Sequence, residues 1–449
     1  MLQILPKNLI NLANACPKPL YLVGGSVRDY LSGYPLNKPD WDICSPMGAD
    51  EFVSIAKAQG FNVQAVYQNT GTVKLSDTQN NDYEFSCFRS DKYVRGVHTP
   101  IEIFFTDDIE KDARRRDFTA NAVYFDIDAN RIVDPLDGVT AIKEKRLSTV
   151  ASAKKVFSED GLRLLRLARQ AAQLGFTPDE ACLQGAKENA SLIDDISPER
   201  IYTELCLLLS ADEKYGVAYG PYHGLKILEQ TGVLARIFPE LALGKNMQQR
   251  PDFHNHDILE HSLRAVKYAD KSVRLAALLH DVGKPICMID DGNAHAHPNV
   301  GKEISIQILQ RLKAPKRVIQ TVSELTALHM YDFNCQTSEK KLRKFFVEHY
   351  ALLPQLLHLK QADFSACKDD ISPAPTCVKW QALLAKMQAE NAPFTLKQLA
   401  IKGNDLLALG IAPDKIATVL QNLLLRAAYT PKINEKTTLC KIALHEYNR

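Results

Sequence analysis

The spacing of hydrophobic residues changes about one third of the way along the chain. In the first 150 residues, short apolar runs predict strands at 21–23, 41–44, 72–76 and 83–88. Helices are expected near 27–31 and 50–59, and the polar segment 89–100 is expected to form a loop. From about Ser158 onward, apolar residues recur at helical spacing almost throughout. The pattern predicts an α+β fold in which a head of strands and helices precedes a long helical body.

Changes in composition mark three candidate domain boundaries. They lie near Val150, near Gly244 and at the proline-containing segment 371–375. We therefore expect a head, a helical neck, a further helical domain and a tail, over residues 1–150, 151–245, 246–370 and 371–449. The sequence contains no internal repeat and no low-complexity tract.

The composition is typical of a globular protein with reduced thiols. The 449 residues include 55 Lys or Arg and 53 Asp or Glu, and the net charge of +2 excludes a uniformly basic nucleic-acid coat protein but not a local basic groove. Hydrophobic residues make up 45%, which is too many for a disordered chain. No apolar run reaches the ~18 residues of a membrane helix, and the N-terminal prolines do not fit a secretion signal. Ten cysteines without a CxxC pair add to the expectation of a cytoplasmic protein with no membrane partner.

A glycine pair lies between the first predicted strand and the first predicted helix, in the segment Gly24-Gly25-Ser26-Val27-Arg28-Asp29. Two glycines let the backbone approach a ligand closely, and the start of the following helix directs N–H groups at an anion. Arg28 could add a bidentate contact with phosphate. By itself the pattern is more typical of a plain turn, because Gly-Gly pairs are common in turns.

Two aspartates, Asp40 and Asp42, follow about fifteen residues later. Residues two apart in a strand point to the same face, so the two carboxylates converge. Like charges this close repel unless a cation lies between them, and carboxylate oxygens suit Mg²⁺. A solvated turn is the alternative, but the preceding Gly-Gly loop favours a site for Mg²⁺ and phosphate. Glu84 could be a third acidic group, although an ordinary exposed strand residue explains it equally well.

Two further segments are rich in arginine. Residues 114–122 contain three consecutive arginines beside Asp117, which fits triphosphate binding but also a basic surface helix. In the segment 159–169, four charged residues recur three apart and are expected on one helical face: Asp160, Arg163, Arg166 and Arg169. A salt-bridged surface helix is the alternative for this face.

Together with the segments 134–138 and 197–204, these motifs resemble those of the class II tRNA nucleotidyltransferases, the CCA-adding enzymes, and of the related bacterial poly(A) polymerases. The matching pieces occur in family order and span residues 20–205; Ala120 stands where the family usually has Ile. The resemblance implies a polymerase-beta-like mixed-sheet head followed by an all-α neck, body and tail. It also implies a catalytic Mg²⁺ site at Asp40 and Asp42, and a nucleotide site formed by Gly25, Arg28, Arg116, Asp160, Arg163, Arg166 and Arg169.

The reaction that the resemblance implies is addition of C, C and A to tRNA 3′ ends from CTP and ATP. A two-metal mechanism fits the paired carboxylates, with one Mg²⁺ lowering the pKa of the RNA 3′ hydroxyl and the other holding the triphosphate. Asp160 could accept from the exocyclic amine of C or A, while Arg163 donates to a ring acceptor. G and U present the opposite order of donors and acceptors, so they would leave these partners unpaired.

Two neighbouring segments bear on which nucleotides are added. The segment 89–98 resembles the family's loop between the DxD and RRD motifs, which favours an enzyme able to add the terminal A. Residues 71–76 lack the Gly-Arg/Lys-Arg/Lys-Phe element that is usual in poly(A) polymerases. An A-adding specialist is the alternative within the family, and the choice between CC, A and complete CCA addition stays open here.

A second set of candidate metal ligands lies in the helical body. His280 and Asp281 follow a predicted helix, with another histidine about twenty residues upstream. This arrangement resembles the HD phosphohydrolase superfamily, which implies a site of His261, His280, Asp281 and Asp363 that suits a transition metal such as Ni²⁺. Three more histidines, His295, His297 and His329, are candidate outer ligands. Hydrolysis of phosphate esters is therefore expected as an additional activity or, in the alternative interpretation, as the main one.

The segment 399–413 resembles the RNA-contacting tail of the same nucleotidyltransferases. A protein that recognises the shape of the acceptor and TψC arms of tRNA needs only distributed Lys and Arg, which fits the near-neutral total charge. The expected partners are thus tRNA, CTP and ATP, and the oligomeric state stays open.

Overall fold

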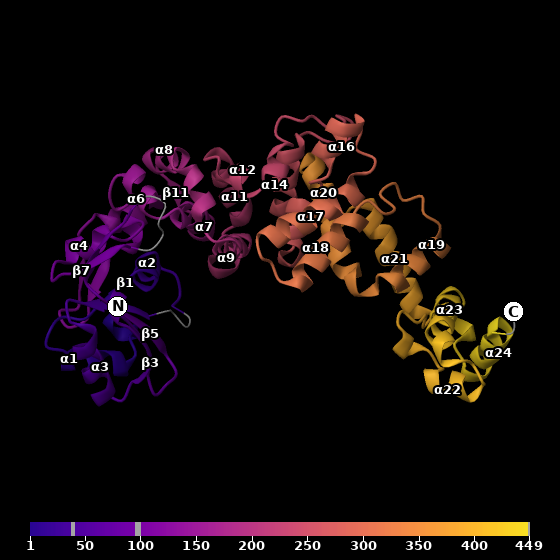
Figure 1. Cartoon of the computed structure of the whole chain (residues 1–449), viewed down its shortest axis with the longest axis horizontal. Coiled ribbons are helices and arrows are strands. Elements are labelled where there is room, and N and C mark those ends of the chain that lie inside the picture. Colours follow the sequence, from indigo (N-terminus) through magenta and orange to yellow (C-terminus); the bar gives the residue numbers. More distant parts are fainter. Residues whose placement is uncertain (37–40, 95–99, 448–449) are drawn as a thin grey trace. The chain divides into compact units, whose positions relative to one another are not determined.

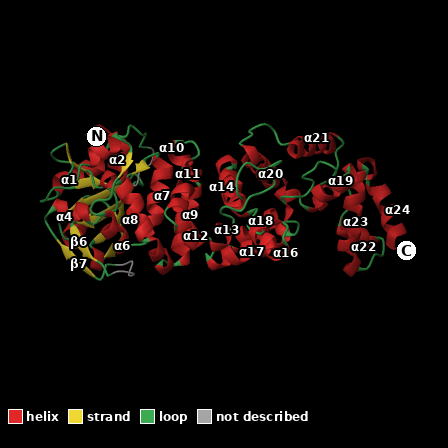
Figure 2. Cartoon of the chain, turned by 90° about the horizontal axis from the view of Figure 1, so that it is seen from above, coloured by secondary structure: helices red, strands yellow, loops and turns green. Residues whose placement is uncertain are grey.

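The computed structural model of the protein describes residues 1–36, 41–94 and 100–447. The chain forms two compact units, Met1–Pro239 and Glu240–Arg449 (Figure 1). All strands of the described residues belong to the first unit, and the second unit is helical (Figure 2). In this described part, no helix is both long enough and apolar enough to cross a membrane. The predicted α+β fold, with strands confined to the N-terminal part, is confirmed.

A seven-stranded mixed sheet forms the centre of the first unit. Its strands follow the order β3-β4-β5-β2-β1-β8-β9. Their bounds are Tyr21–Val23 (β1), Trp41–Ser45 (β2), Asn62–Tyr67 (β3), Thr72–Ser76 (β4), Asp82–Cys87 (β5), Tyr124–Asp126 (β8) and Arg131–Val133 (β9). Among the described pairs of this sheet, β2 and β5 are parallel and the others antiparallel. The four predicted strands are confirmed, and β3, β8 and β9 complete the sheet.

The two faces of the sheet are covered differently by α3 (Ala49–Ala58) and α4 (Ile109–Arg114). On one face, Phe85 of β5 stacks on Phe52 of α3 with 3.7 Å between ring centroids. On the other, Cys44 of β2 belongs to a buried cluster that includes Ala113 of α4. Since side chains two residues apart share a face, Asp42 lies on the same face as Cys44. This face therefore carries the aspartate and lies beside the arginine-rich segment that follows α4.

The prediction of a loop over residues 89–100 is wrong at its N-terminal end. Arg89–Lys92 forms β6, which pairs in antiparallel register with β7 (Glu102–Phe105). The strand is polar, so the alternation of apolar and polar residues that reveals a half-buried strand is missing. Cross-strand pairing holds it instead, and Lys92 Nζ lies 3.0 Å from Glu102 Oε2. Residues 95–99 lie outside the described residues.

Helices make up the remainder of the first unit. They are α1 (Lys7–Ala15), α2 (Gly25–Leu31), α5 (Gly138–Lys143), α6 (Ala153–Glu159), α7 (Leu162–Leu174), α8 (Glu180–Glu188), α9 (Pro198–Leu209), α10 (Asp212–Tyr215), α11 (Gly220–Gln230) and α12 (Val233–Ile237). α7 packs against α9 and α11, and its apolar residues Leu165 and Ala168 are buried there. The helical spacing of these leucines and alanines therefore reflects burial between helices.

The prediction that Asp160 shares a helix with the three arginines is wrong. α6 ends at Glu159, and Asp160 is extended, with a φ of −149°. Gly161 precedes α7, and a Cβ atom there would lie 2.4 Å from the carbonyl oxygen of Leu192. The Asp160 carboxylate accepts a hydrogen bond from Leu162 N at 2.9 Å, as Asp commonly does at the start of a helix. Asp160 thus lies at the junction of α6 and α7.

The second unit is built from helices that pack in pairs. They are α14 (Ile258–Tyr268), α15 (Arg274–Leu279), α16 (Lys284–Asp291), α17 (His297–Arg311), α18 (Lys316–Leu328), α19 (Glu339–Glu348), α20 (Leu353–Lys368), α21 (Pro375–Ala389), α22 (Gly403–Ala408), α23 (Ile416–Tyr429) and α24 (Lys436–Tyr447). α14 packs against α20, and α17 packs against α18. α15 ends immediately before His280, which confirms the predicted helix end. The expected division into four regions stays a prediction.

Gly161→Ala tests the close contact between the start of α7 and Leu192. The added methyl group would meet a backbone carbonyl, so we expect the free energy of unfolding to fall by about 1–3 kcal/mol. Gly48→Ala is the matched control, because Gly48 also has a negative φ and an added Cβ would have no atom within 4 Å. Chemical denaturation measures the free energy of unfolding of both variants. Equal values for Gly161→Ala and Gly48→Ala would contradict the close contact between Gly161 and Leu192.

Candidate functional site

The Gly-Gly loop lies directly against the strand that carries Asp42. Gly24 has a φ of +77°, and a Cβ atom at this position would lie 3.0 Å from Asp42 Oδ2. Both the backbone conformation and the close approach require glycine here. Ser26, in the first turn of α2, is buried, and its hydroxyl has no hydrogen-bond partner among the described residues. A buried hydroxyl without a partner fits a polar group supplied by a ligand.

The predicted third acid, Glu84, shares the face of Asp42. The parallel pairing of β2 with β5 sets Asp42 opposite Glu84, and the pairing of β4 with β5 sets Lys74 opposite Glu84. Directly paired residues point to the same face of a sheet. Lys74 Nζ lies 3.7 Å from Glu84 Oε2, and both side chains are half exposed. The sheet thus brings two carboxylates to one face, whereas Asp40 lies outside the described residues.

Arg28 is buried behind the loop. Its Nη2 donates to Asp29 Oδ1 at 2.7 Å, and its Nη1 donates to Asn121 Oδ1 at 2.7 Å. Nη2 also lies 3.2 Å from the hydroxyl oxygen of Tyr215 in α10. A Cβ atom at Gly25 would lie 3.5 Å from the same Nη2. Arg28 therefore links the loop to the arginine-rich segment and to α10, and its expected contact with nucleotide stays a prediction.

Arg116 belongs to a buried cluster centred on Asp112. Arg115 Nε and Arg116 Nη2 lie 2.7 and 3.0 Å from the two carboxylate oxygens. The hydroxyl of Tyr124 donates to Asp112 Oδ2 at 2.8 Å. Burial raises the pKa of Asp112, but the two guanidiniums outweigh it and lower this pKa to about 2. Arg116 is held by this cluster on the side of the sheet where Cys44 is buried.

Asp117 connects the arginine-rich segment to α7, a role that the sequence analysis missed. Its Oδ2 accepts from Arg166 Nε at 2.9 Å and from Arg166 Nη2 at 2.6 Å. Its Oδ1 accepts from Asn121 Nδ2 at 2.9 Å, and Gln170 Nε2 lies 3.3 Å from Oδ2. Despite burial, the charge of Arg166 and these hydrogen bonds hold the pKa of Asp117 far below its usual range. Its place directly after three arginines was the available signal.

The other two arginines of α7 also have carboxylate partners. Arg163 is buried; its Nη1 donates to Glu159 Oε2 at 2.8 Å, and its Nη2 donates to the carbonyl of Arg115 at 2.8 Å. Arg169 Nε donates to Glu204 Oε2 at 2.7 Å. Each of the three arginines of α7 thus has a carboxylate partner, and Arg163 and Arg166 also join α7 to the arginine-rich segment. Their expected contacts with nucleotide stay predictions.

Four histidines and two aspartates converge in the second unit: His261, His280, Asp281, His297, His329 and Asp363, called the HD cluster below. His261 Nε2 lies 3.0 Å from Asp363 Oδ1 and 3.4 Å from Asp281 Oδ2. His280 Nε2 lies 3.2 Å from Asp281 Oδ2. The Nε2 atoms of His297 and His329 lie 3.3 and 3.5 Å from Asp281 Oδ1. The four predicted ligands thus lie together, and Asp281 faces two groups of ligands, one through each oxygen.

Three histidines of the HD cluster have a defined tautomer. Nδ1 of His280 lies 2.8 Å from a backbone carbonyl oxygen, and Nδ1 of His297 and of His329 each lie 2.6 Å from another. A carbonyl oxygen only accepts, so Nδ1 carries the proton and the neutral ring keeps its lone pair on Nε2. Nε2 of His297 and Nε2 of His329 are 3.2 Å apart, as are those of His261 and His280. Lone pairs this close repel, so the geometry fits metal ions on both sides of Asp281.

Without a metal ion, the neighbouring carboxylates keep His280 protonated. Burial lowers the pKa of His280, but Asp281 and Asp363 outweigh it and raise this pKa to about 10. A metal ion bound at Nε2 would therefore replace that proton. Oδ2 of Asp281 forms an ion pair with Lys284 Nζ at 2.6 Å, whereas Oδ1 lies near the Nε2 atoms of His297 and His329. A buried carboxylate is costly unless cations compensate it, and Lys284 supplies one such charge on the Oδ2 side. Of the candidate outer ligands, His297 and His329 join the cluster, whereas His295 is exposed.

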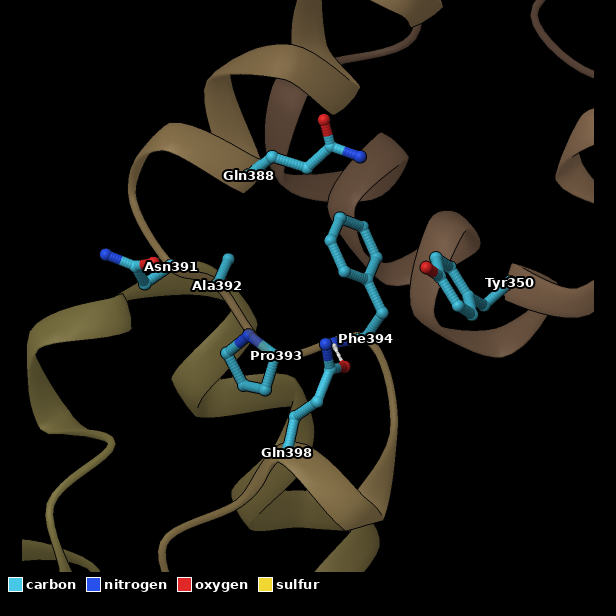
Figure 3. Close-up of a pocket in the computed structure, with 7 residues that line it drawn as sticks. All are labelled: Tyr350, Gln388, Asn391, Ala392, Pro393, Phe394 and Gln398. Carbon is cyan, nitrogen blue, oxygen red and sulfur yellow. Dashed lines mark hydrogen bonds between the residues drawn. The ribbon is translucent and has the colours of Figure 1, made fainter.

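A pocket of about 270 Å³ lies elsewhere in the second unit (Figure 3). Its lining residues are Tyr350, Gln388, Asn391, Ala392, Pro393, Phe394 and Gln398. The rings of Tyr350 and Phe394 stack with 4.7 Å between centroids, and Gln398 Oε1 accepts from Phe394 N at 2.7 Å. None of these seven side chains is charged, so the pocket does not match the chemistry expected of a triphosphate site.

Three family profiles match consecutive parts of the chain. They are the poly A polymerase head domain over residues 20–148, the probable RNA and SrmB-binding site of polymerase A over 175–243, and the HD domain over 258–348. The first match contains the Gly-Gly loop, the Asp42 strand and the arginine-rich segment. The third contains five of the six members of the HD cluster, and Asp363 lies beyond it.

Two named proteins resemble the chain over more than two thirds of its length. It is 32% identical over 327 residues to the multifunctional CCA protein of Acinetobacter baumannii, covering 69% of this chain and 74% of that protein. It is 29% identical over 428 residues to the A-adding tRNA nucleotidyltransferase of Deinococcus radiodurans, covering 91% of each. The fold is similar to the CCA-adding enzyme of Bacillus stearothermophilus in complex with CTP, with a TM-score of 0.66, 23% identity, and coverage of 98% of this chain and 97% of that chain. The Gly-Gly loop, the strand that carries Asp42, the arginine-rich segment and these relatives together establish that the chain belongs to the family of tRNA nucleotidyltransferases that includes the CCA-adding and A-adding enzymes.

Proposed function

We propose that this enzyme adds C, C and A to tRNA 3′ ends from CTP and ATP, releasing pyrophosphate and using no nucleic-acid template. The observation that carries the proposal is the close approach of the Gly24 backbone to Asp42, because it puts a glycine loop of the kind that binds phosphate beside a carboxylate that can hold a metal ion. The multifunctional CCA protein of Acinetobacter baumannii and the CCA-adding enzyme of Lactococcus lactis, 33% identical over 238 residues, support the same reaction.

Asp40 and Asp42 are proposed to hold Mg²⁺, with Glu84 as a third acid on the same face. The carboxylate pair Asp42 and Glu84 and the buried hydroxyl of Ser26, which has no partner within the described part of the chain, fit a hard cation that carries phosphate. When bound, Mg²⁺ would activate the RNA 3′ hydroxyl and neutralise charge on the departing pyrophosphate. The residues of the chain hold the reacting groups in line, which is the main source of rate in such transfers.

Asp160 and Arg163 are proposed to select the base. Glu159 and the carbonyl of Arg115 hold the guanidinium of Arg163, which also lies over the ring of Tyr93 at 5.7 Å from its centroid. A guanidinium held this firmly presents a donor in a defined direction, and Asp160 presents an acceptor at the start of α7. C and A match that donor and acceptor order, whereas G and U would leave the partners unpaired.

The alternative within the family is addition of the terminal A alone. It is favoured by the similarity to an A-adding tRNA nucleotidyltransferase over 91% of the chain. Three tRNA transcripts, ending before CCA, after C and after CC, distinguish the two functions when each is given labelled CTP or ATP. Addition of C to the first two transcripts supports the proposal. Addition of A to the third transcript alone supports the alternative.

A second activity, hydrolysis of phosphate esters such as 2′,3′-cyclic phosphates, is proposed for the HD cluster. The observation that favours it is the position of Asp281, whose two oxygens face separate groups of histidines. A transition metal such as Ni²⁺ would there supply an activated water and bind the phosphate oxygens. The histidines hold their lone pairs toward that site through Nδ1 hydrogen bonds to backbone carbonyls. Absence of hydrolysis with Ni²⁺, Mn²⁺, Co²⁺ and Mg²⁺ would overturn this activity.

Asp42→Ala should lower the rate of nucleotide addition by about 10³-fold or more, because it removes a ligand proposed to hold the metal at the reacting phosphate. Binding of tRNA, measured by filter retention or anisotropy, should change little. Asp82→Ala is the control, since Asp82 is an exposed aspartate at the start of a neighbouring strand. Addition at a near-normal rate by Asp42→Ala would rule out its role in metal binding.

Asp160→Ala should reduce discrimination against UTP and GTP by about tenfold or more, because it removes the acceptor for the exocyclic amine. The ratio of kcat/KM for CTP to that for UTP measures the change. Asp160 also accepts from Leu162 N, so Asp179→Ala, which removes the capping acceptor for Cys182 N, controls for lost helix capping. An unchanged ratio with equal losses for all nucleotides would assign Asp160 to capping alone.

His297→Ala should weaken transition-metal binding and ester hydrolysis by about 10–100-fold, because its Nε2 faces Asp281 Oδ1. His295→Ala is the matched control, since this neighbouring histidine is exposed. Isothermal titration with Mn²⁺ and hydrolysis of a 2′,3′-cyclic nucleotide measure the two effects. Nucleotide addition should be unchanged in both variants, and equal metal binding by both would contradict a ligand role for His297.

A further inference from the structure

A thiol lies next to the HD cluster together with two imidazoles. One ring nitrogen of His254, one of His261 and the Sγ of Cys367 lie within 4.8 Å of one another. The ring of His254 meets that of His261 edge to face, with 4.9 Å between centroids and 90° between planes. The three side chains come from the loop before α14, from α14 itself and from the last turn of α20. Packing of α14 against α20 is what brings them together.

Two ring nitrogens in this group have no hydrogen-bond partner within the described residues. They are Nδ1 of His261, whose side chain is fully buried, and Nδ1 of His254. The other three histidines of the HD cluster each donate Nδ1–H to a backbone carbonyl, so His261 is the exception. A buried ring nitrogen without a partner is costly, and a bound cation would satisfy it.

Hydrogen bonds to α20 hold the loop that carries His254. The N–H of Asn255 donates to the carbonyl of Cys367 at 2.9 Å. Lys368 Nζ donates to the carbonyl of Asp252 at 2.7 Å. Bonds on both sides of His254 therefore hold its imidazole near the thiol and near α14, and the three donors are positioned before any ligand binds.

We propose that His254, His261 and Cys367 form a zinc site with two imidazole ligands and one thiolate. Sulfur and nitrogen donors suit zinc, and three protein ligands leave the fourth tetrahedral position for water or another small ligand. The HD cluster offers only nitrogen and oxygen donors, so the thiolate separates the two sites chemically. A neutral imidazole has one lone pair, so His261 serves one site at a time. Zinc at Cys367 therefore competes with a metal ion in the HD cluster for this histidine.

Titration of the metal-free, full-length protein with Co²⁺ tests the site, because a thiolate bound to Co²⁺ gives a near-ultraviolet charge-transfer band that nitrogen and oxygen ligands do not give. We expect a band of the intensity of one thiolate per chain, which Zn²⁺ abolishes on addition. Cys367→Ser should lose the band. Cys377→Ser should keep it. Cys377 is a matched control because its Sγ donates to the carbonyl of Leu357 at 3.4 Å, as the Sγ of Cys367 donates to that of Asp363 at 3.3 Å.

His254→Ala tests the ligand role of His254 and leaves Cys367 in place. In this variant the band should still form, but the Co²⁺ affinity measured from it should be weaker by about tenfold or more. A parent protein without the band, or a band that persists in Cys367→Ser, would overturn the proposal. Unchanged affinity in His254→Ala would overturn the three-residue composition. These readouts do not depend on nucleotide addition or on ester hydrolysis, so failure of either proposed activity leaves them interpretable.

Discussion

The buried carboxylate of Asp117 holds together the parts of the first unit that the proposed reaction needs. Its Oδ2 accepts two hydrogen bonds from Arg166 of α7 and one from Gln170, and its Oδ1 accepts one from Asn121. Asn121 in turn accepts from Arg28, the arginine behind the Gly-Gly loop. Charge-assisted hydrogen bonds are strong where water is excluded, and a network of this kind is satisfied in one arrangement only. The position of α7 relative to the Gly-Gly loop therefore depends on this carboxylate.

The buried carboxylates of the HD cluster lie mainly beside histidines, whereas those of the first unit lie beside arginines. The two kinds of partner differ in their chemistry. Arginine stays protonated, so the partners of Asp117 and Asp112 form permanent ion pairs. Imidazole can lose its proton and offer a lone pair instead, so the partners of Asp281 and Asp363 can exchange protons for metal ions. Burial of acidic groups thus supports the fold in the first unit, and in the second it brings together the donors of the proposed metal site.

Several site residues could be predicted because their chemistry follows from local spacing. The strand that carries Asp42 is confirmed. The convergence of Asp40 with Asp42, expected from the two-residue period of a strand, stays a prediction because Asp40 lies outside the described residues. His280 and Asp281 follow a helix end that the apolar pattern already indicated. By contrast, the polar strand β6 and the break at Gly161 escaped prediction. The first depends on pairing with β7, and the second on the carbonyl of Leu192, which closes the space that a side chain would need.

The sequence by itself determined the fold class, the order of the motifs and the identity of the chemical groups, because these depend on residue type and on spacing within one strand or helix. Only the tertiary structure decided which distant groups meet. Glu84 joins Asp42 through the register of two parallel strands, and Cys367 meets His254 through the packing of α14 against α20. Asp117 reaches Arg166 across nearly fifty residues of chain. Contacts of this kind depend on how whole elements pack, and a local pattern of apolar and polar residues does not encode the register or the partner of that packing.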